Sequence, residues 1–198
     1  INSDELIKNN DVKFYKRLAE GFYNDTYLMD QNACSSPHLI FWIGHSLKQA
    51  QELFWGHLLE VVKDRYSLAP IHAVDKHYDI CRLAIELAEI GMVKSHENLI
   101  HRVQLGELPE DVTALRGQFG LFFEYHAADL NGLEHVVTDR FQTLTYFGVA
   151  RETFIELYRS QRWRGVDRIV PIGRALDIGL IWDGYDVIQS LTRRVTVE

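Results

Sequence analysis

The chain has 198 residues, which is enough to bury one sizeable core, so we expect a single domain over residues 1–198. Apolar residues make up 46% and charged residues 25% of the chain, values that are ordinary for a soluble globular protein. The net charge of -7 argues against a nucleic-acid partner, because phosphate binding needs a basic surface.

The sequence predicts neither a membrane span nor a secretory leader. The longest apolar run, from Leu39 to Ile43, is far too short to cross a bilayer, and the first ten residues are polar. Two cysteines, Cys34 and Cys81, cannot form a disulfide framework, and we interpret them as idle free thiols. We therefore expect a cytoplasmic protein without a membrane partner.

Apolar residues at steps of three and four predict helices along the first half of the chain. We expect a helix from about Asp4 to Tyr23, followed by a turn-rich loop up to Pro37. A further helix carries Ile80 to Ile90 and ends at Gly91, a residue that suits a helix C-terminus. The clearest helical pattern lies between them and consists of Ile40, Ile43, Leu47, Ala50, Phe54, Leu58 and Val61.

The second half continues the same pattern. We expect helices from Ser95 to about Val103, over Val112 to Phe123, and from Asp129 to Leu144, followed by two C-terminal helices. Only RRVTVE at the end of the chain alternates as a strand does. The predicted fold class is therefore all-α, with seven or eight helices in one domain.

The two C-terminal segments, TYFGVARETFIELYRSQ and RALDIGLIWDGYDVIQSL, carry a family resemblance. Together they resemble the last two helices of the protoglobin and globin-coupled-sensor family. This resemblance implies a globin-like, all-α sensory or regulatory domain that binds a small molecule between its helices and takes part in signal transduction.

The resemblance also implies positions for the ligand pocket. In the family, a haem-binding histidine precedes a glycine by four residues, and Gly148 matches that glycine. The ligand position then falls on Leu144, which has no lone pair for iron, so the chain resembles a non-haem variant. We expect a small apolar ligand in a pocket formed by Leu144, Gly148, Phe154, Tyr158, Phe122 and Phe123.

Family members dimerise through their last helices, and the apolar stripe of the final segment agrees with this. We expect a homodimer interface at Leu180, Tyr185, Ile188 and Leu191. The alternative is that this stripe packs on the core of its own chain.

Two further functions stay open. A haem-binding gas sensor would use His126 or His135 as its iron ligand. A helical metal-binding protein or enzyme would use His77 and Cys81, which are four residues apart, although two ligands do not make a metal site. The chain lacks Glu-x-x-His, His-Glu-x-x-His and Gly-x-Ser-x-Gly patterns, so we assign no metal site and no catalytic residue and expect no enzyme activity.

Overall fold

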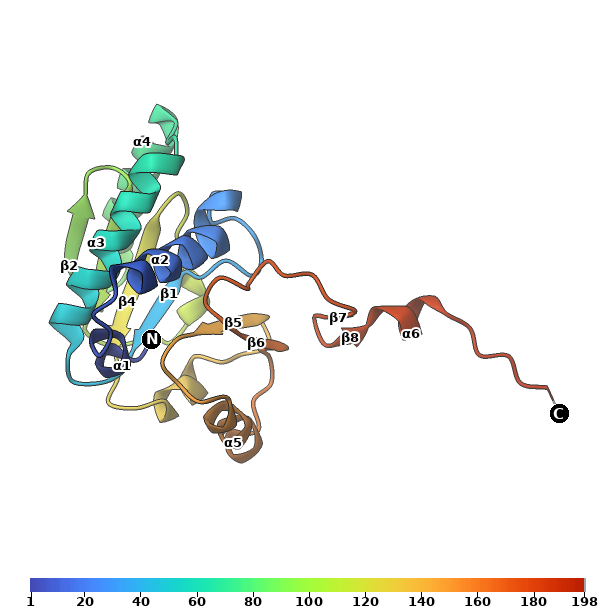
Figure 1. Ribbon diagram of the computed structural model, residues 1–198. Coiled ribbons are helices and arrows are strands. Elements are labelled where there is room, and N and C mark those ends of the chain that lie inside the picture. The colour runs from blue at the N-terminus through green and yellow to red at the C-terminus, as the bar shows by residue number, and fades with distance from the viewer. Residues whose placement is uncertain (198) are drawn as a thin grey trace.

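A mixed four-stranded sheet forms the centre of the protein in its computed structural model, which describes residues 1–197 (Figure 1). The strand order is β1 (Leu39–Trp42), β4 (Leu121–His126), β3 (Ile100–Leu105) and β2 (Ile90–His96). β1, β4 and β3 run parallel, and β2 is antiparallel to β3. The all-α fold class expected from the sequence is therefore wrong, and so is the resemblance to the globin family.

The central strand β4 is buried on both faces of the sheet. Phe122 points into one apolar core, whereas Leu121 and Phe123 point into the other. Its neighbours pair with it in register, with Leu39 of β1 and Val103 of β3 opposite Phe123. Strands that are covered on both faces tend to be apolar along their length, and β4 is apolar from Leu121 to Phe123, before the buried Glu124.

Helices cover the two faces of this sheet. α2 (Val12–Thr26) and α3 (Leu47–Arg65) pack on one face, together with the short α1 (Ser3–Ile7). α4 (Pro70–Glu86) packs on the other face through Leu83, and it begins with a proline, whose missing N–H costs nothing in a first turn. The outward side of α4 is apolar and exposed at Ile71, Val74, Tyr78 and Ile85.

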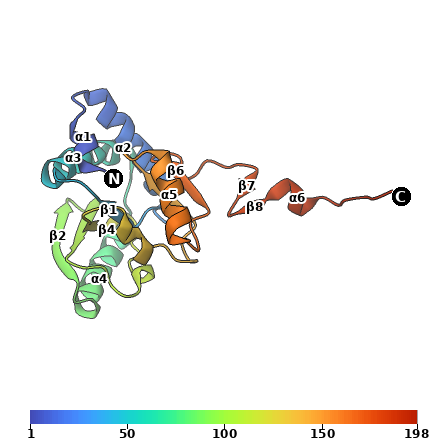
Figure 2. The same ribbon diagram turned by 90° about the horizontal axis from the view of Figure 1, so that it is seen from below.

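A smaller unit lies beside the β1 edge of the main sheet (Figure 2). It consists of the parallel pair β5 (Thr143–Tyr146) and β6 (Arg168–Pro171), with α5 (Arg151–Gln161) connecting them. The buried residues Phe154 and Leu157 of α5 form a third core with Leu133, Val137, Trp163 and Val166. Three short 3-10 helices complete the body: η1 (Tyr27–Met29), η2 (Val112–Ala114) and η3 (Asn131–His135).

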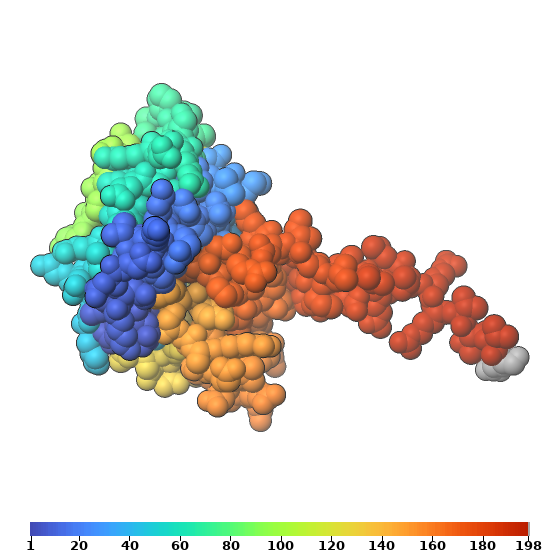
Figure 3. Space-filling model, viewed as in Figure 1, coloured from blue at the N-terminus to red at the C-terminus, as the bar shows by residue number. Residues whose placement is uncertain are grey.

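The C-terminal segment leaves the body after Ala175 and projects from it (Figure 3). It contains the two-residue strands β7 (Ile181–Trp182) and β8 (Tyr185–Asp186) and the short helix α6 (Val187–Leu191). The long final helix expected from the sequence does not form. Residues 192–197 have no regular structure, so the strand-like alternation of RRVTVE does not form a strand over the described residues, which exclude Glu198.

Several other expected helices are strands instead. The predicted helix through Ile40 begins only at Leu47, because Leu39–Trp42 form β1. The segment after Ser95 forms β3, and the segment through Phe123 contains η2 and β4. The helix expected from Asp129 to Leu144 consists only of η3, followed by β5. For β3 and β4 the physical reason is that burial on two sides hides the period of two by which a strand is recognised.

The expected first helix is divided in two. Asp11 ends the linker between α1 and α2 and caps α2, with its side chain accepting a hydrogen bond from the Lys13 backbone. Of the two C-terminal helices, the first is present as α5. Among residues 1–197, no helix combines the length and the apolar character that crossing a membrane requires.

Candidate functional site

An apolar cavity of about 170 Å³ lies between β1 and β5. Its wall comes from the edge of the main sheet, from the smaller β5–β6 unit and from the loop that precedes β1. Apolar wall residues include Phe22, Leu39, Ile40, Val137, Leu144 and Phe154. A dry cavity of similar size in another protein holds benzene, so this cavity has room for a ring or for part of an alkyl chain.

The loop before β1 brings a thiol to this cavity. Cys34 lies in the cavity wall and its residue is exposed, so its sulfur can meet both a ligand and solvent. The thiol sits in a turn that is closed by the Ser36 amide, which donates to the Ala33 carbonyl at 3.0 Å. Cys34 is therefore an exposed free thiol in the cavity wall.

The buried side chain of Gln31 fixes this loop to the main sheet. Its amide nitrogen donates to the carbonyls of Pro37 and Leu121, each at 3.0 Å, and its oxygen accepts from the Gly120 amide at 3.0 Å. Gln31 itself has a left-handed backbone with φ of 61°, a conformation that a non-glycine residue keeps only when its surroundings impose it. The position of Cys34 is thus set by hydrogen bonds on both sides of it.

Several polar side chains interrupt the apolar wall, among them Ser36, His38, Arg140, Gln142, Thr143 and Thr145. Three of them have a buried atom without a hydrogen-bond partner. These atoms are the hydroxyl oxygen of Ser36, Nδ1 of His38 and the amide oxygen of Gln142. Burial lowers the pKa of His38 to about 4, and the nearby positive charge of Arg116 acts in the same direction. The imidazole is therefore neutral at neutral pH.

The cavity brings together two of the residues predicted from the sequence to line a pocket. Leu144 of β5 and Phe154 of α5 both belong to its wall. Tyr158 lies one helical turn beyond Phe154 and lines a second hollow with Arg151 and Arg159, on the other side of Tyr146 and Phe154. Gly148 is outside both, in a turn with φ of 71° whose Cα lies close to the side chains of Asn2 and Glu5.

The other predicted pocket residues lie elsewhere. Phe122 and Phe123 are fully buried in β4 on opposite faces of the main sheet, where they are core residues. The two proposed haem ligands do not line the cavity: His126 ends β4 with its Nε2 at 2.9 Å from the Gly44 carbonyl, and His135 ends η3 on the surface.

The candidate metal ligands and the candidate interface residues are also exposed. The sulfur of Cys81 lies 3.9 Å from Nε2 of His77 on α4. Within the described part of the chain, no group of three or more potential metal ligands comes together. The predicted interface residues Leu180, Tyr185, Ile188 and Leu191 all lie in the projecting segment and are 54% to 82% exposed.

A second polar cluster lies beneath α3, and its polar groups form hydrogen bonds with one another. The buried carboxylate of Glu124 accepts hydrogen bonds from the ring nitrogens of Trp42 and Trp55 at 2.8 and 2.7 Å. Gln51 donates to it at 3.0 Å, and Arg102 donates to both of its oxygens at 2.8 and 3.2 Å. Every part of this cluster has a partner within it, so we assign it to the stability of the fold and not to a ligand.

Neither the models of known protein families nor the curated proteins include a match to this chain. The function therefore has to be argued from the cavity itself. Sequence patterns pointed to two of its wall residues but not to Cys34, because the turn-rich segment around it predicts a loop and nothing in the segment indicates what the loop faces.

Proposed function

We propose that the protein binds a small apolar acyl compound in the cavity between β1 and β5 and forms a thioester with it through Cys34. The observation that carries this proposal is that one exposed thiol belongs to the wall of a mainly apolar cavity. The binding part of the proposal keeps the small apolar ligand expected from the sequence. Its site lies between two sheets instead of between globin helices.

The chemistry requires an activated acyl donor, such as another thioester. The Cys34 thiolate attacks the carbonyl carbon, a new carbon–sulfur bond forms, and the bond between that carbon and the donor's sulfur breaks. The donor leaves as a thiol after taking up the proton that Cys34 loses. The reaction is an exchange of thioesters, so it needs no oxidant or reductant.

The fixed position of the Cys34 loop supports this role. A nucleophile gains from being held in one place relative to its substrate, because the entropy of alignment is lost during folding and not during the reaction. Gln31 supplies this fixation through its three hydrogen bonds. The apolar wall contributes by removing the alkyl chain of the acyl group from water.

Acylation by a simple donor tests the proposal. We expect that incubation with the octanoyl thioester of N-acetylcysteamine adds one octanoyl group to the protein, as measured by intact mass and located at Cys34 by peptide mapping. Cys81 is the internal control, because it is also a free exposed thiol but lies on α4 away from the cavity. Binding in the cavity should make acylation of Cys34 about tenfold faster or more.

Two matched variants complete this experiment. The Cys81→Ser variant should be acylated as fast as the unmodified protein, and the Cys34→Ser variant should form no stable thioester at the cavity. Excess methyl octanoate should slow the acylation of Cys34 by occupying the cavity. Equal rates at the two cysteines, with no effect of methyl octanoate, would show that the cavity plays no part.

A second property is favoured by the projecting C-terminal segment. We infer that this segment pairs with a second copy of the chain, because its apolar side chains face water although apolar side chains gain from burial. Those more than half exposed include Ile178, Leu180, Ile181, Tyr185, Ile188 and Leu191. Signal output through such a dimer stays a prediction.

A further inference from the structure

The wall of the apolar cavity is not uniformly apolar, and three of its buried polar atoms are unpaired. Among residues 1–197, five buried side-chain polar atoms have no hydrogen-bond partner, and three of the five residues, Ser36, His38 and Gln142, line this one cavity. Ser36 is only 5% exposed. An unpaired buried polar atom costs about 1–3 kcal/mol, so three in one cavity indicate that an occupant supplies their partners.

The chemistry of the three side chains limits what that occupant is. The amide oxygen of Gln142 only accepts hydrogen bonds, and the Ser36 hydroxyl both donates and accepts. The neutral imidazole of His38 has one donor and one acceptor nitrogen. The ionised oxygens of a carboxylate or phosphate only accept hydrogen bonds, so they cannot pair with the amide oxygen of Gln142, although Arg140 also lines the cavity. A hydroxyl group both donates and accepts, and it fits this set.

The distance from Cys34 indicates where on the ligand this hydroxyl lies. Ser36 follows Cys34 by two residues, so their Cα atoms are at most about 7 Å apart. His38 follows two residues later, in the stretch that leads into β1, and Gln142 comes directly before β5 on the facing unit. A group that meets Ser36 is therefore only a few bonds from a carbon attached to the Cys34 sulfur.

We propose that Ser36, His38 and Gln142 form a polar subsite that selects acyl groups with a hydroxyl on one of the first carbons after the carbonyl. This inference rests on the proposed acyl site, and it names the substrate class of that site: hydroxyacyl groups of medium length instead of unsubstituted ones. The apolar remainder of the wall, including Leu144 and Phe154, then holds the rest of the alkyl chain.

The test compares two neutral esters that differ only in the hydroxyl. Binding of methyl octanoate and methyl 3-hydroxyoctanoate is measured by calorimetry on the Cys34→Ala variant, in which no covalent bond can form. A net hydrogen bond contributes about 0.5–1.5 kcal/mol, so two of them make the hydroxy ester bind about 5- to 100-fold more tightly. Equal affinities for the two esters overturn the subsite and indicate that water fills it.

Substitutions in the wall identify the partners of the hydroxyl. In the same background, Ser36→Ala and Gln142→Met should each reduce the preference for the hydroxy ester about 2- to 10-fold and leave the affinity for methyl octanoate unchanged or higher. Ser67→Ala is the matched control, because Ser67 is exposed and remote from the cavity. A preference that survives both wall substitutions also overturns the subsite.

The outcomes separate this inference from the proposed function. If both esters bind with equal affinity and Cys34 is acylated, the proposed subsite is contradicted and the proposed acyl site is supported. If neither ester binds, both the proposed acyl site and the proposed subsite are contradicted. Thermal unfolding of each variant shows whether it is folded. The two wall substitutions lie in different parts of the fold, so if one variant does not fold, the other still tests the subsite.

Discussion

The carboxylate of Glu124 joins side chains from three elements in the interior of the protein. It lies on β4 and accepts hydrogen bonds from Trp42 of β1, from Gln51 and Trp55 of α3, and from Arg102 of β3. The guanidinium of Arg102 also lies over the ring of Trp55, 5.0 Å from its centre. Without Glu124, the charge of Arg102 and two indole N–H groups would be buried without partners.

We expect Glu124→Ala to lower the free energy of unfolding by about 3–5 kcal/mol, because it leaves a buried charge uncompensated. Urea denaturation followed by circular dichroism measures this change. Glu134→Ala is the control, since Glu134 is exposed in η3 and its replacement should change stability by less than about 0.5 kcal/mol. A loss of only about 1 kcal/mol for Glu124→Ala would contradict the structural role of the cluster.

Among single residues, the sequence predicted which side chains are apolar and packed but not which of them face a ligand. Leu144 and Phe154 were predicted as pocket residues and do line the cavity. Phe122 and Phe123 were predicted by the same reasoning and are plain core. An aromatic side chain buried against a cavity and one buried against other side chains have the same sequence pattern, so only the packing distinguishes them.

Helix α2 is connected to the start of the C-terminal segment by one carboxylate. Asp25 is buried near the end of α2, and its oxygens accept hydrogen bonds from the backbone amides of Gly173 and Ala175 at 2.6 and 2.8 Å. Gly173 has φ of 94° and its backbone lies against Gly21, so a side chain at either glycine would separate the two segments.

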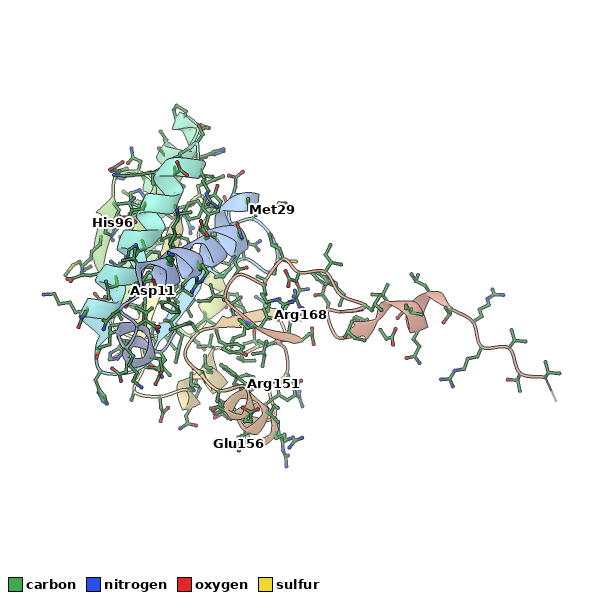
Figure 4. The ribbon with its side chains drawn as sticks, in the orientation of Figure 1. Asp11, Met29, His96, Arg151, Glu156 and Arg168 are labelled. Atoms are coloured by element: carbon green, nitrogen blue, oxygen red, sulfur yellow. The ribbon has the colours of Figure 1, made fainter. Side chains whose placement is uncertain are left out.

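A guanidinium holds the same turn from the other side. Arg168 of β6 lies where the segment leaves the body (Figure 4) and donates to the carbonyls of Arg174, Ala175 and Asp177 at 2.8 to 3.0 Å. It also lies over the ring of Trp182, at 4.8 Å from the ring centre. The projecting segment is thus fixed at its base by two opposite charges, and its exposed part begins directly after them.

We expect Asp25 to give the protein a specific dependence of stability on pH. Burial raises the pKa of its carboxyl from 3.8 to about 6, although the amides of Gly173 and Ala175 act against this. The folded chain then binds this proton more tightly than the unfolded chain, so the contribution of Asp25 to stability falls as the pH rises from about 4 to about 6. A difference of two pKa units corresponds to about 3 kcal/mol.

The Asp25→Asn variant tests this expectation, because an amide does not titrate in this range. Urea denaturation at several pH values should show a decline in stability between pH 4 and 6 that is larger in the unmodified protein than in the variant. Asp11→Asn serves as the control, since Asp11 is exposed on the surface and caps the other end of the same helix. Parallel curves for the unmodified protein and Asp25→Asn would contradict the assignment.

Among helices and strands, the sequence predicted the type of element correctly for α5, which has one buried face and one face exposed to water. α5 was predicted because Phe154, Ile155, Leu157 and Tyr158 share one helical face, of which Phe154 and Leu157 are buried in the structure. β3 and β4 were predicted as helices because nearly every residue in them is buried, and a short run of apolar residues has no visible period. What makes such a run a strand is the presence of a neighbour on each side, which local sequence does not specify.

The whole molecule combines a packed body with an apolar segment that has no cover of its own. In Figures 1 and 3 the residues after 177 extend away from the body. Ile178 is 89% exposed and Leu191 is 82% exposed, values that are unfavourable for apolar side chains unless something covers them. A second copy of the chain would satisfy this need symmetrically, if the same segment of each copy covered the other.

We expect the unmodified protein to be a dimer in solution and Leu191→Glu to be a monomer, because the introduced charge would be buried in the interface. Multi-angle light scattering measures the mass of both. Val12→Glu is the control, since Val12 is 66% exposed at the start of α2 and lies outside the segment. A monomeric unmodified protein, or a Leu191→Glu variant with unchanged mass, would contradict the dimer.

The sequence by itself determined that the protein buries a sizeable apolar core and that α5 is a helix. These properties depend on local composition and spacing. The order of the strands, the closed cluster around Glu124 and the position of Cys34 in the cavity wall were decided only by the tertiary structure. Each of them joins residues that are tens of positions apart, and hydrogen bonding between such residues leaves no periodic pattern along the chain.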